Sequence, residues 1–278
     1  MFYLILAIAS SAMISILIRL SSDKIQANIG MLAVNYCTCL VIAALYAIPG
    51  GLFPRSAALP QAAGLGILHG VLYLVSFVLF QVNVQKNGVV LSAIFMKLGL
   101  LVPMVLSIFL FREIPSALQL IGFAIAVFAI ILINMEKSSQ KLQFPGGLLL
   151  LLLAGGTADA MSKIYEQTGS AALAPHFLFY TFIVAFVLCL GLMAYKKKRI
   201  GKAELLYGFY IGITNFFSAK FLLRALEDIP AVVAYPTYSV STIFVVTLFG
   251  VFLFRESLSR RQWFSVTAIA AALILLNI

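Results

Sequence analysis

The most informative residues of this chain are the few charged side chains that lie deep inside long apolar stretches. Lys97, Lys220 and Asp159 each stand well inside such a stretch. A charged side chain at the centre of a bilayer costs roughly 3 kcal/mol, so such residues are rare and usually face a cavity or an opposite charge. Basic groups outnumber the single deep acid, Asp159. This imbalance predicts a site that binds an anionic group, such as a carboxylate or a phosphate.

Lys97 is the first candidate for that site. It lies about nine residues into its apolar stretch, which is roughly 13 Å at a rise of 1.5 Å per residue. Gly99 and Pro103 follow it and predict a locally loosened helix of the kind that lines transport sites. The alternative is that Lys97 bonds to backbone carbonyl groups or pairs with Asp159.

Asp159 and Lys163 are four residues apart on one predicted helix, so their side chains lie on one face and can pair. We expect this ion pair. The alternative is that Asp159 takes up and releases a proton during a transport cycle. Arg19 occupies nearly the equivalent place in the first apolar stretch and completes the proton or ion-pair group. Arg19 and Lys163 lie near the ends of their stretches, where extension of the side chain to the membrane surface is an adequate alternative.

Further polar side chains could complete a substrate site. Lys220 would add to the positive field, and the other candidates for substrate binding are Asn215, Tyr235, Tyr238 and His69. His69 lies in the pattern Gly64-x-Gly66-x-x-x-Gly70, whose glycines predict the close approach of another helix. For His69 we therefore favour a packing role over titration.

The sequence shows no pattern typical of an enzyme or a metal site. It has no phosphate-binding glycine loop and no cluster of His, Cys and Asp at metal-ligand spacing. The three cysteines lie inside apolar stretches and are expected to pack there. We predict no catalytic residues, no metal and no cofactor, although three serines leave an intramembrane enzyme as a formal alternative: Ser92, Ser218 and Ser241.

Composition indicates the elements that position these residues. Of 278 residues, 63% are hydrophobic and 10% are charged, with a mean hydropathy of +1.10. Soluble chains carry about 25% charged residues. We predict an all-α membrane protein of about ten transmembrane helices, because ten apolar runs approach the roughly 20 residues that span a bilayer. These runs cover residues 2–20, 29–48, 61–82, 88–110, 116–135, 145–165, 172–194, 204–225, 231–253 and 260–277.

The two halves of the chain are related in sequence. A shift of 143 residues aligns Phe109-Leu110-Phe111-Arg112-Glu113 with Phe252-Leu253-Phe254-Arg255-Glu256 without gaps. We therefore expect two repeats of five helices each, over residues 1–136 and 144–278. Because five is odd, the second repeat would cross the membrane in the opposite sense to the first, which is a recurring plan of transporters.

The distribution of Lys and Arg predicts the orientation. Twelve of the 19 lie in loops after odd-numbered spans and three after even-numbered spans. The positive-inside rule then places both termini outside the cell. The net charge of +10 is assigned to topology and contact with anionic lipids, not to nucleic acid. We expect a multi-pass protein of the prokaryotic inner or plasma membrane.

Several motifs resemble those of the drug/metabolite transporter superfamily, specifically its EamA-type ten-helix permeases. They are the loops at 111–113 and 254–256, the segment Gln85-Lys86-Asn87-Gly88, and the segments 215–218 and 221–226. This resemblance implies a permease or exporter of small metabolites that works by alternating access, with a central cavity lined by the first, third and fourth spans of each half and with no cofactor. It also implies that many members have both termini inside, unlike this chain.

The residues and the resemblance together predict secondary-active transport or exchange of a substrate that bears a carboxylate or a phosphate. The alternative is an exporter of cationic or aromatic compounds, in which the lysines are paired structurally and tyrosines and phenylalanines bind the substrate. A lipid-translocating protein and a membrane protein that does not transport are further alternatives. The expected partners are a small-molecule substrate and membrane lipids, and a homodimer stays open.

Overall fold

The computed structural model describes residues 1–134, 144–254 and 259–278, without the side chains of 88–91, 133–134 and 253–254. The described residues form α-helices and short 3₁₀ turns and contain no strand. The helices are α1 (Phe2–Ser21), α2 (Asn28–Ala47), α3 (Leu59–Leu98), α4 (Leu101–Phe111), α5 (Ala117–Asn134), α6 (Pro145–Thr168), α7 (Ala174–Tyr195), α8 (Lys202–Leu226), α9 (Ala231–Phe254) and α10 (Arg260–Leu276), with 3₁₀ turns at Ile48–Gly50 and Ala171–Leu173.

Seven of the described helical segments have the length and apolar composition needed to cross a membrane. They are Phe2–Ser21, Asn28–Gly50, Leu59–Asn87, Ser92–Phe111, Pro145–Thr168, Ala171–Tyr195 and Ala231–Phe252. The predicted count of about ten spans is therefore met only in part. Among the remaining helices, α10 is only 17 residues long, and α8 carries Asn215 and Lys220 within its apolar sequence.

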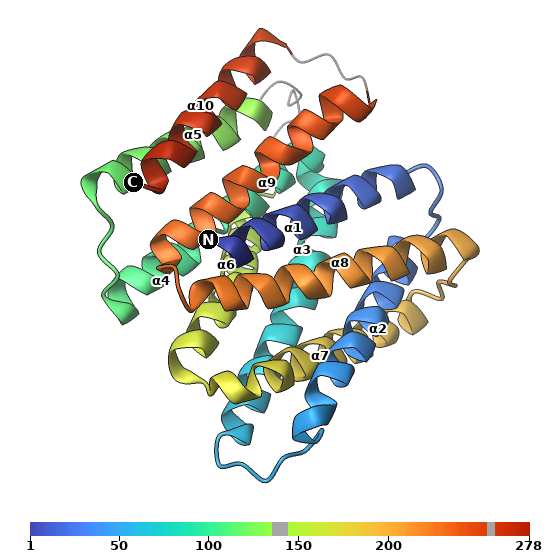
Figure 1. Cartoon of the computed structure of the whole chain (residues 1–278). Helices are drawn as coiled ribbons and strands as arrows, with labels where there is room; N and C mark the ends of the chain where they lie inside the picture. The colour runs from blue at the N-terminus through green and yellow to red at the C-terminus, as the bar shows by residue number, and fades with distance from the viewer. Residues whose placement is uncertain (135–143, 255–258) are drawn as a thin grey trace.

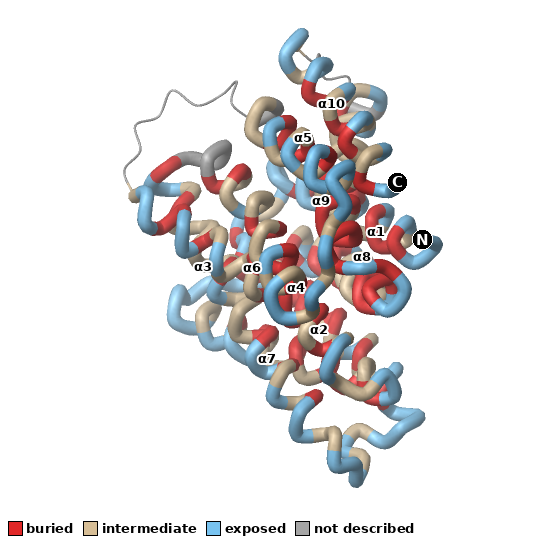
Figure 2. Tube along the Cα trace, turned by 90° about the vertical axis from the view of Figure 1, so that its left-hand side faces the viewer, coloured by how far each residue is buried: buried red, intermediate tan, exposed pale blue. Residues whose placement is uncertain are grey.

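The helices form three groups (Figure 1). α5 and α10 lie side by side at one edge and α2 and α7 pack together at the other, while α1, α3, α4, α6, α8 and α9 lie between them. Figure 2 shows buried positions where helices face one another and exposed positions on their outward sides. Large apolar residues lie on these outward sides, such as Phe109 at 79% and Phe252 at 80% exposure. Such side chains favour contact with lipid over contact with water.

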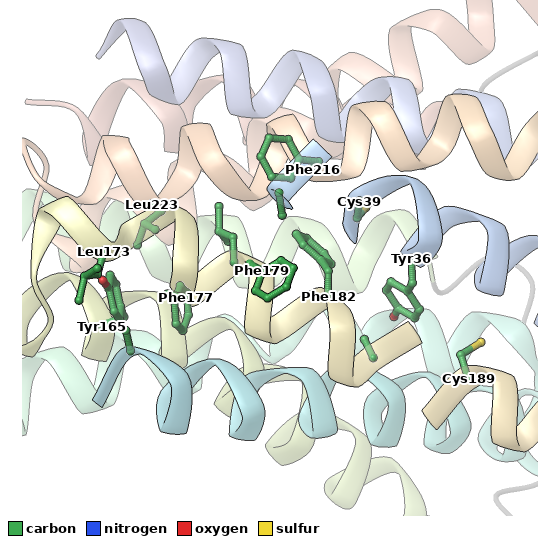
Figure 3. Close-up of a cluster of buried hydrophobic side chains, with 14 of the residues drawn as sticks. Tyr36, Cys39, Tyr165, Leu173, Phe177, Phe179, Phe182, Cys189, Phe216 and Leu223 are labelled. Carbon is green, nitrogen blue, oxygen red and sulfur yellow. The ribbon is translucent and has the colours of Figure 1, made fainter. Parts of the chain in front are cut away.

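The largest apolar core joins α2, α3, α6, α7 and α8 (Figure 3). Phe177 and Phe182 of α7 and Phe216 of α8 are at most 1% exposed and lie at its centre. Tyr165 of α6 stacks on Phe177 with a centroid distance of 4.3 Å. Two smaller clusters hold α1, α8 and α9 together and α5, α9 and α10 together.

The first part of α3 runs antiparallel to α6. Near the start of α3, Gln61 Nε2 donates to the carbonyl oxygen of Thr168 at the end of α6 (2.9 Å). Further along, Asn83 Nδ2 donates to the carbonyl oxygen of Gly147 at the start of α6 (2.9 Å). α3 therefore follows α6 over most of its length in the opposite direction.

The chain then turns back along α6 before it reaches α4. Asn87 Nδ2 donates to the carbonyl oxygen of Phe144, just before α6 (2.9 Å), whereas Glu113, just after α4, lies 2.9 Å from Lys163 near the end of α6. The chain has thus reversed its direction between residues 87 and 113, although Leu59–Leu98 is helical throughout.

The boundary expected between the spans 61–82 and 88–110 agrees with the two segments of membrane-spanning length, Leu59–Asn87 and Ser92–Phe111. The backbone stays helical across this boundary, and the side chains of Asn83 and Asn87 bind the start of α6. The helix is interrupted further on, at Gly99 and Leu100. This agrees with the loosened helix expected beside Lys97.

Glycines bring helices of the two sequence halves into close contact. A Cβ atom at Gly66 of α3 would lie 2.6 Å from the carbonyl oxygen of Phe177 in α7, and one at Gly70 would also meet the α7 backbone. In α8, a Cβ atom at Gly208 would lie 2.7 Å from the carbonyl oxygen of Met31 in α2. The close approach expected for the third apolar run is thus confirmed at Gly66 and Gly70, but a Cβ atom at Gly64 would meet nothing within 4 Å.

Candidate substrate site

Lys97 and Asp159 face one another across the interior. The two side chains interact electrostatically, and Asp159 interacts in the same way with Tyr73 of α3 and with Tyr235 and Tyr238 of α9. Groups from α3 and α9 thus lie within electrostatic range of the carboxylate; Asp159 is exposed, and Lys97 is half-buried. Asp159 is therefore accessible from outside the packed helices, with side chains of α3 and α9 in electrostatic range.

The two charges are held apart rather than joined. Within the described part of the chain, no basic group lies within the 4.0 Å of a direct ion pair with Asp159. Lys97 likewise has no direct acidic partner there. An opposite pair separated by accessible space can place a bound group between the charges, whereas a closed salt bridge cannot.

The tyrosines fix the position of α9 beside this pair. The Tyr235 hydroxyl donates to the backbone carbonyl oxygen of Asp159 (2.7 Å). Tyr238 OH and Ser218 Oγ of α8 are 2.8 Å apart. Tyr235 is only 2% exposed, whereas Tyr238 is half-buried. Tyr235 thus positions the site, and Tyr238 presents a hydroxyl group to it.

The ion pair expected between Asp159 and Lys163 is wrong. Lys163 Nζ lies 2.9 Å from Glu113 Oε1 and 2.7 Å from Glu166 Oε2. Lys163 is 3% exposed, and its ammonium lies 5.9 Å from the centroid of the Phe111 ring. Helical spacing did place Asp159 and Lys163 on one face, but the long lysine side chain extends toward the two glutamates.

Glu113 has a second contact that joins three parts of the chain. Its Oε2 accepts a hydrogen bond from the backbone N–H of Val232 in the first turn of α9 (3.2 Å). The carboxylate thereby caps α9 while it neutralises Lys163 on α6. The sequence comparison singled out Phe111-Arg112-Glu113 as a repeat but not its role. The matching Arg255 and Glu256 lie outside the described residues.

Lys220 does not join the site around Asp159. Its ammonium lies over the ring of Tyr46 in α2, 3.3 Å from the centroid. Ser218, two residues earlier on α8, faces Tyr238 and the carbonyl oxygen of Ala7 instead. Residues two apart on a helix point in different directions. The expectation that Lys220 adds to the field at Lys97 is therefore not met.

Three other candidates also lie apart from Asp159. Asn215 Nδ2 donates to Asn35 Oδ1 of α2 (3.2 Å) and joins two helices. His69 is 1% exposed, its ring lies 4.4 Å from that of Tyr73, and its Nδ1 is 3.4 Å from Thr181 Oγ1. Arg19 is exposed in the last turn of α1.

Sequence reasoning missed Tyr73, because a half-buried tyrosine in an apolar run carries no distinguishing signal. It also missed Glu204 of α8, whose carboxylate accepts hydrogen bonds from the backbone N–H groups of Gln26 (2.7 Å), Ala27 (3.0 Å) and Gly201 (3.1 Å). The described residues contain no group of three His, Cys, Asp or Glu side chains that could hold a metal ion.

The comparisons with known proteins agree with this architecture. Residues 146–278 match the EamA-like transporter family. An uncharacterized protein of Haemophilus influenzae is 24% identical over 279 residues, which cover 96% of this chain and 95% of the relative. A probable 4-amino-4-deoxy-L-arabinose-phosphoundecaprenol flippase subunit, ArnE, of Proteus mirabilis is 28% identical over 36% of this chain and 95% of its own length.

One solved crystal structure shares the fold. It superposes with a TM-score of 0.74 at 11% sequence identity and covers 99% of this chain and 98% of its own. Residues 146–278, just under half of the chain, are thus similar to the EamA-like transporter family, and the described helices have the length and apolar composition of a membrane protein.

Proposed function

We propose that this chain is a secondary permease for a small metabolite that bears a carboxylate or a phosphate. The observation that carries the proposal is the separated pair of Lys97 and Asp159, which interact electrostatically without a direct ion pair while the carboxylate stays exposed. In a chain this apolar, charges are retained inside only at a considerable cost, and most such charges serve a transported group. Lys97 binds the anionic group of the substrate.

Asp159 takes up a proton when the substrate binds. With both side chains charged, the pair of Lys97 and Asp159 has no net charge, and a bound monoanion would leave the site at −1. Protonation of Asp159 restores neutrality, and a neutral site moves through a low-dielectric interior at lower cost than a charged one. The substrate and one proton would therefore cross together.

A second candidate function is the export of cationic or aromatic compounds. Asp159 has three tyrosines as neighbours, namely Tyr73, Tyr235 and Tyr238, and tyrosine faces bind cations. In that case Asp159 binds the substrate and Lys97 is its counter-charge in the empty state. The compound named for the ArnE relative, 4-amino-4-deoxy-L-arabinose-phosphoundecaprenol, carries both an amino group and a phosphate, which would use both charges of the pair.

We further propose ten spans in two inverted repeats, 1–136 and 144–278, that alternate between two open states. In such a repeat α1 corresponds to α6, α3 to α8 and α4 to α9. The packing of α1 on α8 then corresponds to that of α6 on α3, and the packing of α1 on α9 to that of α6 on α4. The glycine contacts of α3 with α7 and of α8 with α2 are exchanged in the same way. This symmetry supports the repeat that the sequence shift suggests.

The group of Glu113, Lys163 and Glu166, here called the Lys163 cluster, is proposed as the gate on one side of the site. It ties the connection after α4 to α6 and to the first turn of α9. Lys163 lies only one helical turn from Asp159. Opening of this side would break the contacts of Glu113 while Lys163 keeps Glu166. With the termini outside, as the basic loops favour, this gate would face outward.

The test is the thermal stability of the purified protein against metabolites sorted by charge, because a ligand that binds the folded state stabilises it. We expect anions to raise the melting temperature of the wild type and of Lys86→Met, a lysine that lies over the Phe144 ring and away from the site. Lys97→Met should abolish the shift. The second candidate function replaces the first under three conditions: amines raise the melting temperature, Asp159→Asn abolishes that rise, and Lys97→Met does not.

A further inference from the structure

A pocket of about 300 Å³ lies on the face of α8 that is turned away from Asp159. It is enclosed by the end of α2, the start of α7 and the last turns of α8. Its apolar lining includes Leu178, Phe216 and Leu223. Lys220 and Tyr46 also line it. Phe216 and Leu223 also belong to the core in Figure 3, so the floor of the pocket is fixed by packing.

Lys220 has no acidic partner in the part of the chain that the structure describes. Its ammonium lies over the ring of Tyr46, which cannot neutralise its charge. At the rim of the pocket Arg224 is already paired with Glu227 (2.6 Å), so those two charges cancel. The pocket therefore keeps one uncompensated positive charge above an apolar floor.

The depth of the pocket indicates the source of an anion that would bind this charge. Tyr46 is one residue from the end of α2 at Ala47, and Lys220 is six residues from the end of α8 at Leu226. Six residues correspond to roughly 9 Å along a helix. The pocket thus lies at one end of the bundle, at the level where bilayer headgroups meet acyl chains.

We propose that this pocket binds an anionic phospholipid of the surrounding membrane. The headgroup phosphate lies at Lys220, and the first part of an acyl chain lies on Leu178 and Leu223. A zwitterionic lipid would bring its own cation next to Lys220 and binds less well. This lipid site is separate from the substrate site and does not depend on which substrate is transported.

The test uses the full chain, purified in detergent and delipidated, with short-chain phosphatidylglycerol, short-chain phosphatidylcholine or inorganic phosphate added. We expect phosphatidylglycerol at ten times its Kd to raise the melting temperature by about 3–6 °C, and the other two to have little effect. Lys220→Met should abolish this shift. Lys86→Met should retain it, because Lys86 is an exposed lysine over an aromatic ring, 4.6 Å from the Phe144 centroid, but lines no part of this pocket.

Equal stabilisation by the two lipids, or a full shift in Lys220→Met, would overturn the proposal. A Lys220-dependent shift with inorganic phosphate as large as that with phosphatidylglycerol would show a site for a free anion instead. If Lys220→Met does not fold, native mass spectrometry of the wild type and of Lys220→Arg decides. Both should retain phosphatidylglycerol in preference to phosphatidylcholine, and no preference in the wild type rejects the lipid site.

Discussion

Removal of the Lys163 ammonium should destabilise the protein more than any other single change in the Lys163 cluster. Lys163 is 3% exposed and bridges two carboxylates that are 14% and 13% exposed. Lys163→Met keeps a flexible apolar side chain of similar length but leaves Glu113 and Glu166 near one another without a cation. Loss of one partner of a buried ion pair costs about 3–5 kcal/mol.

The water that reaches the two carboxylates lowers this figure, because a partly solvated or protonated carboxyl group relieves the unpaired charge. We therefore expect the free energy of unfolding to fall by about 3 kcal/mol in Lys163→Met, at the lower end of the range for buried pairs. Glu113→Gln should cost less, about 1–2 kcal/mol, since the amide oxygen can still accept from the Val232 N–H and Lys163 keeps Glu166.

The double variant Lys163→Met/Glu113→Gln tests the pairing itself. It removes one of the two stranded negative charges, so its cost should be smaller than the sum of the two single costs by at least about 1 kcal/mol. The measurement is reversible unfolding in mixed micelles of a mild detergent and dodecyl sulfate, followed by circular dichroism. The reasoning would be refuted if Lys163→Met lowered the free energy of unfolding by less than about 1 kcal/mol and the cost of the double variant equalled the sum of the two single costs.

Three further predictions concern packing, coupling and capping. Gly212→Ala should destabilise by about 1–3 kcal/mol in the same unfolding assay, because its Cβ atom would lie 2.5 Å from Thr38 Cβ, whereas Gly155→Ala, with nothing within 4 Å, should not. Asp159→Asn should abolish uptake driven by a pH gradient in proteoliposomes but preserve exchange of substrate for substrate, and retained proton-driven uptake would exclude Asp159 as the proton carrier. Glu204→Ala should lower the free energy of unfolding by about 2–3 kcal/mol, since it strands three backbone N–H groups, and the exposed Asp23→Ala should change it little.

Hydropathy alone placed most helices within a few residues. The runs 29–48 and 145–165 correspond to α2 (Asn28–Ala47) and α6 (Pro145–Thr168). This works because a helix that crosses a membrane must be apolar over a fixed length. The division between the third and fourth runs was also predicted within a few residues. The role of Asn83 and Asn87 could not be predicted, because these side chains resemble loop residues but serve as hydrogen-bond partners of another part of the chain.

The candidate site was predicted in its charges but not in its contacts. Lys97 and Asp159 could be identified because charged residues at membrane depth are rare and therefore informative. Their mutual partnership could be offered only as an alternative, since it depends on how α3 and α6 pack. Spacing along one helix favoured Asp159 as the partner of Lys163, but Lys163 pairs with Glu113, which comes from a distant connection, and with Glu166. Nothing in the sequence could show that Lys220 and Ser218 face different neighbours.

The glycine contacts also determine when the helices of this protein can finish packing during synthesis. The close-packed face of α3 at Gly66 and Gly70 is made to fit α7, and the face of α2 around Met31 is made to fit α8. Each of these two faces in the first half of the chain therefore packs against a helix of the second half. The first five helices must wait in the membrane with these faces covered only by lipid until residues beyond 212 have left the ribosome. Two halves made as separate chains contain all the surfaces needed to find each other.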